Sequence, residues 1–142
     1  MKKINKQADI TYKETKDIPR EKVIRIYQAN EWSSANKPEQ LYRALLNSDS
    51  LVSAWKNDVL IGIGNAISDG HLVVYYPHLL ILPDYQGQGI GSSIMERLMS
   101  NYDGFHQHML VADAEATGFY KRCGFTRAGS TVSMWIYDGD DH

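Results

Sequence analysis

The sequence predicts one α/β domain, built on a mixed β-sheet with helices packed against it. Two observations predict this class. A meander of three strand-like segments separated by short turns occupies the middle of the chain, and two helical segments then alternate with two further strand-like segments. A length of 142 residues, 43% of them hydrophobic, suits one domain with a substantial core. We therefore expect a single domain over residues 1–142.

The expected elements follow the order β-α-α-β-β-β-α-β-α-β. Pro19 and Pro38 are each well placed to begin a helix, because the N–H group that proline lacks has no partner in the first helical turn. Gly124 stands where a left-handed residue favours the end of a helix. Strands are expected at residues 10–15, 51–55, 59–67, 71–82, 105–112 and 132–137, and helices after Pro19, after Pro38, across residues 94–99 and across residues 115–122.

Composition and charge argue against several classes of function. Lys and Arg number 15 against 17 Asp and Glu, and the resulting net charge of −2 argues against nucleic acid as a partner. No apolar run is long enough for a signal peptide or a membrane span, so we expect a cytoplasmic protein that does not bind membranes. The single cysteine, Cys123, excludes an internal disulfide and a cysteine-rich zinc site, and the histidines lack metal-ligand spacing. We therefore expect no metal.

A glycine-rich loop, Gln-Gly-Gln-Gly-Ile-Gly at residues 86–91, follows a strand and opens a helix. Unpaired N–H groups and the positive end of the helix dipole favour an anion there, and glycines let a bulky anion approach the backbone. The loop therefore suits a pyrophosphate. A Walker loop would need a lysine that is missing, and a dinucleotide fingerprint is matched only if Ser92 replaces its last glycine. A simple glycine-rich turn is the third alternative.

Two motifs resemble those of one family. Residues 86–91 match its Gln/Arg-x-x-Gly-x-Gly/Ala signature, and residues 119–125, Phe-Tyr-Lys-Arg-Cys-Gly-Phe, resemble its Phe-Tyr-x-x-x-Gly-Phe segment. The motifs stand in the family's order, and the element order agrees over essentially the whole chain. The chain thus resembles the GCN5-related N-acetyltransferases (GNAT), and residues 112–115 look most like the small-amine members. The resemblance implies the GNAT fold, with about four helices around the sheet.

The resemblance implies acetyl-coenzyme A (acetyl-CoA) as the acetyl donor. Its pyrophosphate would lie on backbone N–H groups of the glycine loop and the helix start, and the preceding strand would lie beside its pantetheine arm. Asp113 would hold the cofactor amide or brace the next helix. The residues implied to bind the cofactor are Leu79, Leu80, Ile81, Gln86, Gly87, Gln88, Gly89, Ile90, Gly91, Ser92, Asp113 and Phe119.

The resemblance also implies direct transfer of the acetyl group, with Tyr120 as the acid. A phenol with a pKa near 10 keeps a proton that it can give to a leaving thiolate, and a core tyrosine is the alternative. His78 is a candidate for proton relay because histidine titrates near pH 6.5, although strand alternation points it away from Tyr75 and Pro77. A structural His78, and a water chain as the base, are the alternatives. Cys123 is expected to pack rather than to act as a nucleophile.

The acceptor is expected between the first two helices and the last strands. Aromatic rings there could stack on an aryl group or surround an ammonium, whereas a core role is the alternative for Tyr27 and Trp135. The residues expected to contact the acceptor are Tyr27, Trp32, Ser33, Asn36, Tyr75 and Trp135.

We predict an acetyl-CoA-dependent N-acetyltransferase that acts on a small primary amine, namely an arylalkylamine, an amino acid or a polyamine. One alternative is a non-catalytic acyl-CoA-binding regulatory module, and another is a protein or peptide N-acetyltransferase. The exposed edge of the last strand favours a homodimer.

Overall fold

The structure of the protein is a computed structural model that describes residues 9–142. The longest helix in this part of the chain has 11 residues, whereas a membrane span needs about 20. None of the described helices is long and apolar enough to cross a membrane. The elements are β1 (Ile10–Lys13), α1 (Arg20–Ala29), η1 (Ser33–Asn36), α2 (Pro38–Leu46), β2 (Ser50–Lys56), β3 (Val59–Ser68), β4 (Val73–Tyr75), β5 (Leu79–Ile81), η2 (Pro83–Tyr85), α3 (Ile90–Ser100), β6 (Gln107–Met109), η3 (Ala114–Ala116) and α4 (Thr117–Arg122).

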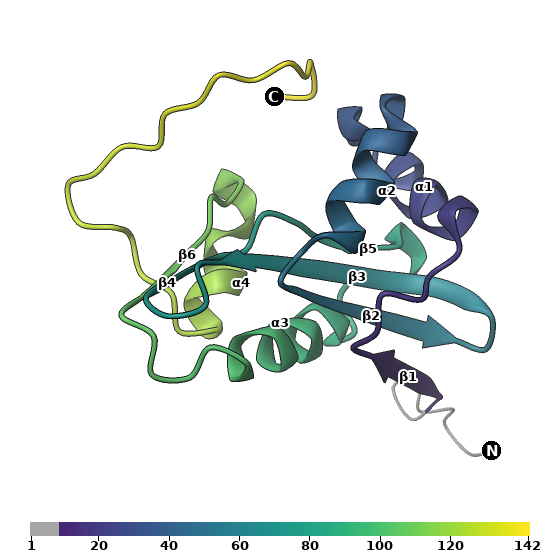
Figure 1. Cartoon of the computed structure of the whole chain (residues 1–142), viewed down its shortest axis with the longest axis horizontal. Coiled ribbons are helices and arrows are strands. Elements are labelled where there is room, and N and C mark those ends of the chain that lie inside the picture. Colours follow the sequence, from purple (N-terminus) through teal and green to yellow (C-terminus); the bar gives the residue numbers. More distant parts are fainter. Residues whose placement is uncertain (1–8) are drawn as a thin grey trace.

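The described strands form one mixed sheet. Its order is β1-β2-β3-β4-β6, and β5 also pairs with β3. The pairs are antiparallel except for β4 with β6, which is parallel. Helices α1 and α2 cover one face of the sheet and α3 covers the other (Figure 1). The expected mixed α/β architecture is therefore confirmed.

Strand β3 changes its partner along its length. Its C-terminal end pairs with β4, where Ile67 lies opposite Tyr75. Its middle pairs with β5, where Gly62 lies opposite Ile81. The prediction of one long strand at residues 71–82 is therefore wrong, because this segment forms two short strands with different surroundings.

The break between β4 and β5 has a local cause. Pro77 has no N–H group and cannot donate to a continuous strand ladder. Before it, the N–H of Tyr76 donates to the carbonyl of Met109 at the end of β6 (2.9 Å). After it, the N–H of His78 donates to Oδ1 of Asn65 on β3 (3.1 Å). The hydrogen-bond partner of the chain thus changes from β6 to β3 at this point, and β5 does not pair with β6.

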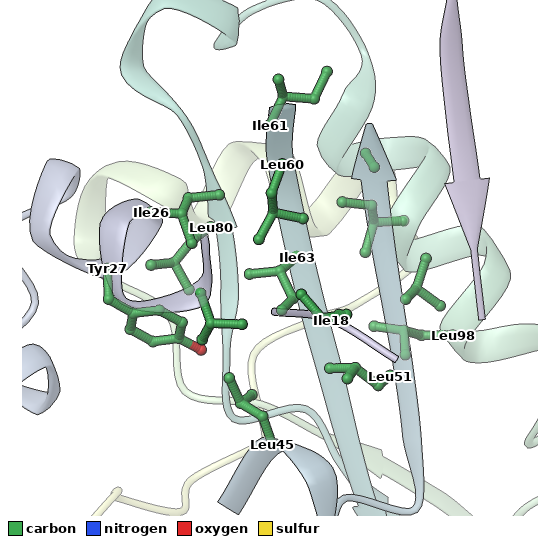
Figure 2. Close-up of a cluster of buried hydrophobic side chains, with 14 of the residues drawn as sticks. Ile18, Ile26, Tyr27, Leu45, Leu51, Leu60, Ile61, Ile63, Leu80 and Leu98 are labelled. Atoms are coloured by element: carbon green, nitrogen blue, oxygen red, sulfur yellow. The ribbon is translucent and has the colours of Figure 1, made fainter. Parts of the chain in front are cut away.

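The hydrophobic core combines the two helical layers with the central strands. Ile26 of α1, Ile63 of β3 and Leu98 of α3 are all fully buried. Figure 2 shows Ile26 and Tyr27 of α1 beside Leu80 of β5. Burial of this apolar surface holds α1 and α3 against the strands from opposite sides.

Two glycines of β3 let α3 approach the sheet closely. A Cβ atom at Gly64 would lie 2.8 Å from Cγ2 of Ile94, and one at Gly62 would lie 2.9 Å from Cδ1 of the same residue. Gly62 is also approached by Ile81 of β5 and by Ile90, the first residue of α3. Larger side chains would overpack this contact. The glycines therefore place the start of α3 next to β5.

The final segment of the chain differs from its prediction. Residues 132–137 were expected to form a strand, but they are extended without a strand partner. Met134 and Ile136 are 92% and 107% exposed. A strand-like sequence needs a neighbouring strand to satisfy its backbone, and this segment leaves the sheet after α4 (Figure 1). The expectation of a last strand at 132–137 is therefore wrong.

The last helical region begins as a 3-10 turn. The helix expected at residues 115–122 is η3 followed by α4. Gly124 has a φ angle of 101°, and the N–H of Phe125 donates to the carbonyl of Tyr120 (3.0 Å), which ends the helix as expected. The strand expected at residues 105–112 is shortened to β6.

Candidate active site

A cavity of about 570 Å³ lies beside β5, and we call it the β5 cavity. Its volume is in the usual range for small-molecule sites. Most residues expected to bind the cofactor line it, whereas Gln88 and Asp113 do not. Asn30, Tyr85, Ala116 and Arg122 also line it, and no role was expected for them. The complete lining is Asn30, Leu79, Leu80, Ile81, Tyr85, Gln86, Gly87, Gly89, Ile90, Gly91, Ser92, Ala116, Phe119, Tyr120 and Arg122.

The glycine loop and the start of α3 form one wall of the β5 cavity. Gly89 is the N-cap of α3 with a φ angle of 81°, a conformation that favours glycine. The N–H groups of the first turn have no partners inside the helix, and the helix dipole is positive at this end. Arg122 adds a positive side chain to the same cavity. These groups fit an anionic ligand such as a pyrophosphate.

Gly91 allows α4 to lie against the start of α3. A Cβ atom there would lie 3.2 Å from Cζ of Phe119. Phe119 and Tyr120 are consecutive on α4, and their ring centroids are 5.0 Å apart. This contact places the second sequence motif beside the first. Tyr120 and the glycine loop therefore line the same β5 cavity.

One edge of β5 carries backbone groups that are not used by the sheet. The N–H of Leu82 donates to the carbonyl of Ile61 on β3 (2.8 Å). Backbone groups alternate in direction along a strand, so those of Leu79 and Ile81 point to the opposite edge. The carbonyl of Ile81 is occupied there by two side-chain donors, Asn30 Nδ2 (3.1 Å) and Gln86 Nε2 (3.2 Å). The N–H groups of Leu79 and Ile81 are therefore directed at the cavity side of the strand.

Tyr120 is half-buried and keeps its proton at neutral pH. Its ring packs against Phe119 and against Phe125, whose centroid is 6.2 Å away. Burial raises the pKa of Tyr120 to about 12. The neighbouring Cys123 packs against the core, and burial also raises the pKa of its thiol. Tyr120 can thus serve as a proton donor, while Cys123 is poorly suited to act as a thiolate nucleophile.

His78 is held in a cluster of aromatic rings. Tyr27 is 0% exposed, and its hydroxyl lies 2.8 Å from Nδ1 of His78. The ring of Trp32 meets both of them edge-on, with centroids 5.0 Å from His78 and 5.7 Å from Tyr27. Burial raises the pKa of Tyr27 and lowers the pKa of His78 to about 4. Both groups are therefore neutral at pH 7.

This pairing determines which nitrogen of His78 carries the proton. Among the described residues, Nδ1 of His78 is the hydrogen-bond partner of the buried Tyr27 hydroxyl, so we infer that this hydroxyl donates to Nδ1 and that the neutral ring carries its proton on Nε2. Such an imidazole offers an N–H donor at Nε2 and has no free nitrogen lone pair. The geometry therefore favours a structural role for His78 over proton relay.

A buried polar network stands behind His78. Asn65 is 4% exposed, accepts from the His78 N–H and donates its own N–H to the His78 carbonyl (3.2 Å). Its Nδ2 donates to Oγ of Ser48 (3.0 Å), which in turn donates to the carbonyl of Ala44. The role of Asn65 is not among those expected from the sequence. An asparagine inside the apolar run of β3 was the signal that could have found it.

A second cavity, of about 360 Å³, lies where the C-terminal segment returns to the domain, and we call it the tail cavity. It holds four carboxylates and one indole ring. Within residues 9–142, no group of three or more His, Cys, Asp or Glu side chains is arranged to hold a metal ion. The complete lining is Asn30, Glu31, Trp32, Asp113, Ala114, Glu115, Asp141 and His142.

The residues expected to contact the acceptor are dispersed around this cavity. Trp32 lines it, and Ser33 borders it by donating its N–H to Asp141 (3.1 Å). Trp135 lies in the C-terminal segment, where its ring is 5.6 Å from that of His142. Tyr27 is buried behind Trp32. Of the six residues, only Trp32 is part of a cavity lining. Asn36 is exposed at the end of η1, and Tyr75 is 37% exposed on β4.

Comparison with known proteins identifies the family. The family model described as the acetyltransferase (GNAT) domain matches residues 13–135. An uncharacterized N-acetyltransferase of Gracilaria tenuistipitata is 35% identical over 72 residues, 49% of this chain and 40% of that protein. A peptidyl-lysine N-acetyltransferase of Salmonella typhimurium is 29% identical over 115 residues, 77% of this chain and 78% of that protein. A GNAT-family acetyltransferase of Streptococcus pneumoniae superposes with a TM-score of 0.80 at 32% identity, over 91% of this chain and 98% of that chain.

The chain belongs to the GNAT family of acetyltransferases, since the family model matches most of its length. The mixed sheet with its helices is the GNAT fold, as predicted. GNAT acetyltransferases use acetyl-CoA as the acetyl donor, and the Gracilaria and Salmonella relatives are both named as N-acetyltransferases. The chain spans less than half the length of the Gracilaria relative. The resemblance to small-amine members stays a prediction.

The buried His78 predicts a dependence of stability on pH. Its pKa is about 4 in the folded chain and about 6.5 when unfolded. Between these pH values the unfolded chain binds more protons, so the free energy of unfolding falls as the pH drops from 7 toward 4, by up to about 3 kcal/mol. Urea unfolding at pH 7 and at pH 4.5 measures the difference. His78→Gln cannot titrate and should lose most of it; an equal difference in this variant would contradict the prediction.

Proposed function

We propose that this protein transfers the acetyl group of acetyl-CoA to a small primary amine. One observation carries the proposal: the β5 cavity and the tail cavity meet at a shared wall residue, Asn30. The β5 cavity has a helix N-terminus and Arg122, which suit an anionic cofactor. The tail cavity has four carboxylates, which suit a cationic amine. The two reactants would thus approach each other from cavities of opposite electrostatic character.

The β5 cavity would hold the cofactor along the strand and the loop. Backbone N–H groups at Gly89, Ile90 and Gly91 would bind the pyrophosphate, and the open edge of β5 would hydrogen-bond the pantetheine arm. When bound, acetyl-CoA supplies the thioester whose carbonyl an amine attacks. A strand N–H beside that carbonyl, from Leu79 or Ile81, would stabilise the negative charge that develops on its oxygen.

Tyr120 would act as the acid. Tyr120 lines the β5 cavity on the side of α4, and its raised pKa keeps the hydroxyl protonated at neutral pH. It would give this proton to the sulfur atom that leaves the acetyl group. The acceptor ammonium must lose a proton before it attacks. Since His78 is neutral and its Nδ1 accepts from Tyr27, we propose that water in the cavity takes this proton.

The lining of the tail cavity bears on the class of amine. Glu31, Asp113, Glu115 and Asp141 would attract a cation and repel a carboxylate, which favours arylalkylamines and polyamines over free amino acids. The ring of Trp32 would stack on an aryl group or contact an ammonium. Asp113 would act on this side, whereas the sequence placed it with the cofactor.

A protein substrate is the second candidate function. The Salmonella relative is named a peptidyl-lysine N-acetyltransferase, and it is matched over 77% of this chain. A lysine side chain is also a primary amine and a cation, so the acidic cavity is compatible with it. A non-catalytic acyl-CoA-binding module is less favoured, because binding alone does not require a proton donor such as Tyr120 beside the loop.

A thiol-release assay tests the proposed function. Incubation with acetyl-CoA and a panel of tyramine, tryptamine, spermidine, free lysine and a lysine-containing peptide should release free CoA thiol with at least one of the first three amines. Release with the peptide alone would favour protein acetylation. Binding of CoA without release for any amine would contradict the enzyme and favour the binding module.

Tyr120→Phe separates catalysis from cofactor binding. Loss of the acid should lower kcat about 100-fold, within the range usual for general acid catalysis, while the CoA dissociation constant should stay within about twofold because the ring is kept. Steady-state kinetics and calorimetric titration with CoA measure the two quantities. A kcat equal to that of the unchanged protein would remove Tyr120 from this role.

We also propose that the protein forms a homodimer. Strands β1 and β6 are the two ends of the sheet order, and unpaired edges favour association. The exposed apolar side chains of residues 132–137 add an apolar surface that favours association. Sedimentation equilibrium should give about twice the chain mass of 16.1 kDa; a mass of one chain at all concentrations would contradict the dimer. The cytoplasmic location stays a prediction.

A further inference from the structure

Asn30, which ends α1, contacts three parts of the molecule. Its Nδ2 donates to the carbonyl of Ile26 within α1 (2.9 Å) and to the carbonyl of Ile81 on β5 (3.1 Å). Its Oδ1 accepts from Nε2 of Gln86 in the glycine loop (3.4 Å). It lines both the β5 cavity and the tail cavity. One half-buried side chain therefore joins the helix end, the strand and the loop.

These contacts converge on the carbonyl of Ile81. That carbonyl points to the open edge of β5, where a bound ligand would compete for backbone groups. Donors from Asn30 and Gln86 both reach it. Because this carbonyl is occupied, a ligand at the open edge can use the N–H and carbonyl of Leu79 and the N–H of Ile81. The edge that is available to a ligand therefore ends at Ile81.

We propose that Asn30 is a positioning residue that closes the open edge of β5 at Ile81 and holds the glycine loop in place relative to the tail cavity. The inference rests on the proposed placement of CoA in the β5 cavity. Asn30 acts through the carbonyl of Ile81 and through Gln86. Its loss would weaken binding by removing the contact that holds Gln86 of the loop and by removing one of the two donors to the Ile81 carbonyl on the ligand edge.

The chain offers a matched control in Asn47, which ends α2 in the same way. The backbone angles are φ −94° and ψ 2° at Asn30, and φ −95° and ψ 3° at Asn47. Nδ2 of Asn47 donates to the carbonyl of Arg43, four residues earlier (2.8 Å), just as Nδ2 of Asn30 donates to that of Ile26. Asn47 lines neither cavity. The two residues therefore share the helix-end role and differ in the contacts to β5 and the loop.

The experiment compares Asn30→Ala with Asn47→Ala by calorimetric titration with CoA. Asn30→Ala should raise the CoA dissociation constant about three- to tenfold, the range expected when one or two hydrogen bonds are lost. Asn47→Ala should leave it within about twofold, although thermal melts should show that both variants lose some stability. Equal dissociation constants for the two variants would overturn the proposal, because Asn30 would then be only a helix cap.

A second pair of variants keeps the test decisive if Asn30→Ala does not fold. Asn30→Asp and Asn47→Asp keep the side-chain size, remove both N–H donors and place the same charge at a helix C-terminus. Only the aspartate at Asn30 would face the carbonyl of Ile81. The rise in the CoA dissociation constant should be larger for Asn30→Asp than for Asn47→Asp, and an equal rise would overturn the proposal.

Amide NMR of the unchanged protein separates this proposal from the cofactor placement on which it rests. Addition of CoA should shift the amide signals of Gly89, Ile90 and Gly91. No shift at these residues would overturn both the placement and the role of Asn30. Shifts at the loop, together with equal effects of the Asn30 and Asn47 variants, would overturn the role of Asn30 and leave the proposed function standing.

Discussion

The separation of β5 from β6, which pair with different strands, is the constraint on which the rest of the site depends. Strand β4 ends beside β6, and the chain then crosses to β3 over three residues, Tyr76 to His78. Asn65 on β3 supports this crossing, because its side chain accepts from the N–H of His78 and its backbone N–H donates to the carbonyl of His78. A continuous ladder would have used the backbone groups of Leu79 and Ile81 within the sheet. Because the sheet does not use them, the N–H groups of Leu79 and Ile81 give the β5 cavity a polar wall.

The electrostatics of the site arise from local geometry rather than from composition. The chain carries a net charge of −2, so it has no basic surplus with which to hold an anion. A helix N-terminus, a glycine loop and Arg122 provide positive potential in the β5 cavity. Carboxylates from α1's end, η3 and the C-terminal segment provide negative potential in the tail cavity. Asn30, which is polar but uncharged, lies where the two potentials meet.

Short sequence patterns predicted much of the fold and brought to attention most of the residues that line the β5 cavity. The glycine loop, Tyr120 and Gly124 lie where their motifs indicated, because each depends on contacts within a few residues. The C-terminal strand was not predictable from its apolar, β-branched residues, since a strand also needs a free neighbour. Asn30, Asn65 and Arg122 were missed for a related reason. Asn30 contacts Ile81, 51 residues away, Asn65 contacts His78, 13 residues away, and Arg122 lines a cavity that distant parts of the chain form, and no local pattern marks such contacts.

The sequence by itself determined the family, the order of most elements and the residues of the loop that suits a pyrophosphate. These depend on local backbone chemistry, which glycine spacing and hydrophobic periodicity record directly. Only the tertiary structure decided that the hydroxyl of Tyr27 pairs with Nδ1 of His78, and that burial keeps His78 a neutral ring in this cluster. It also decided that Asp113 joins Glu31 and Asp141 around a separate cavity. A pKa and a cavity depend on burial and on the side chains that the fold brings together, and neither is a property of neighbouring residues in the chain.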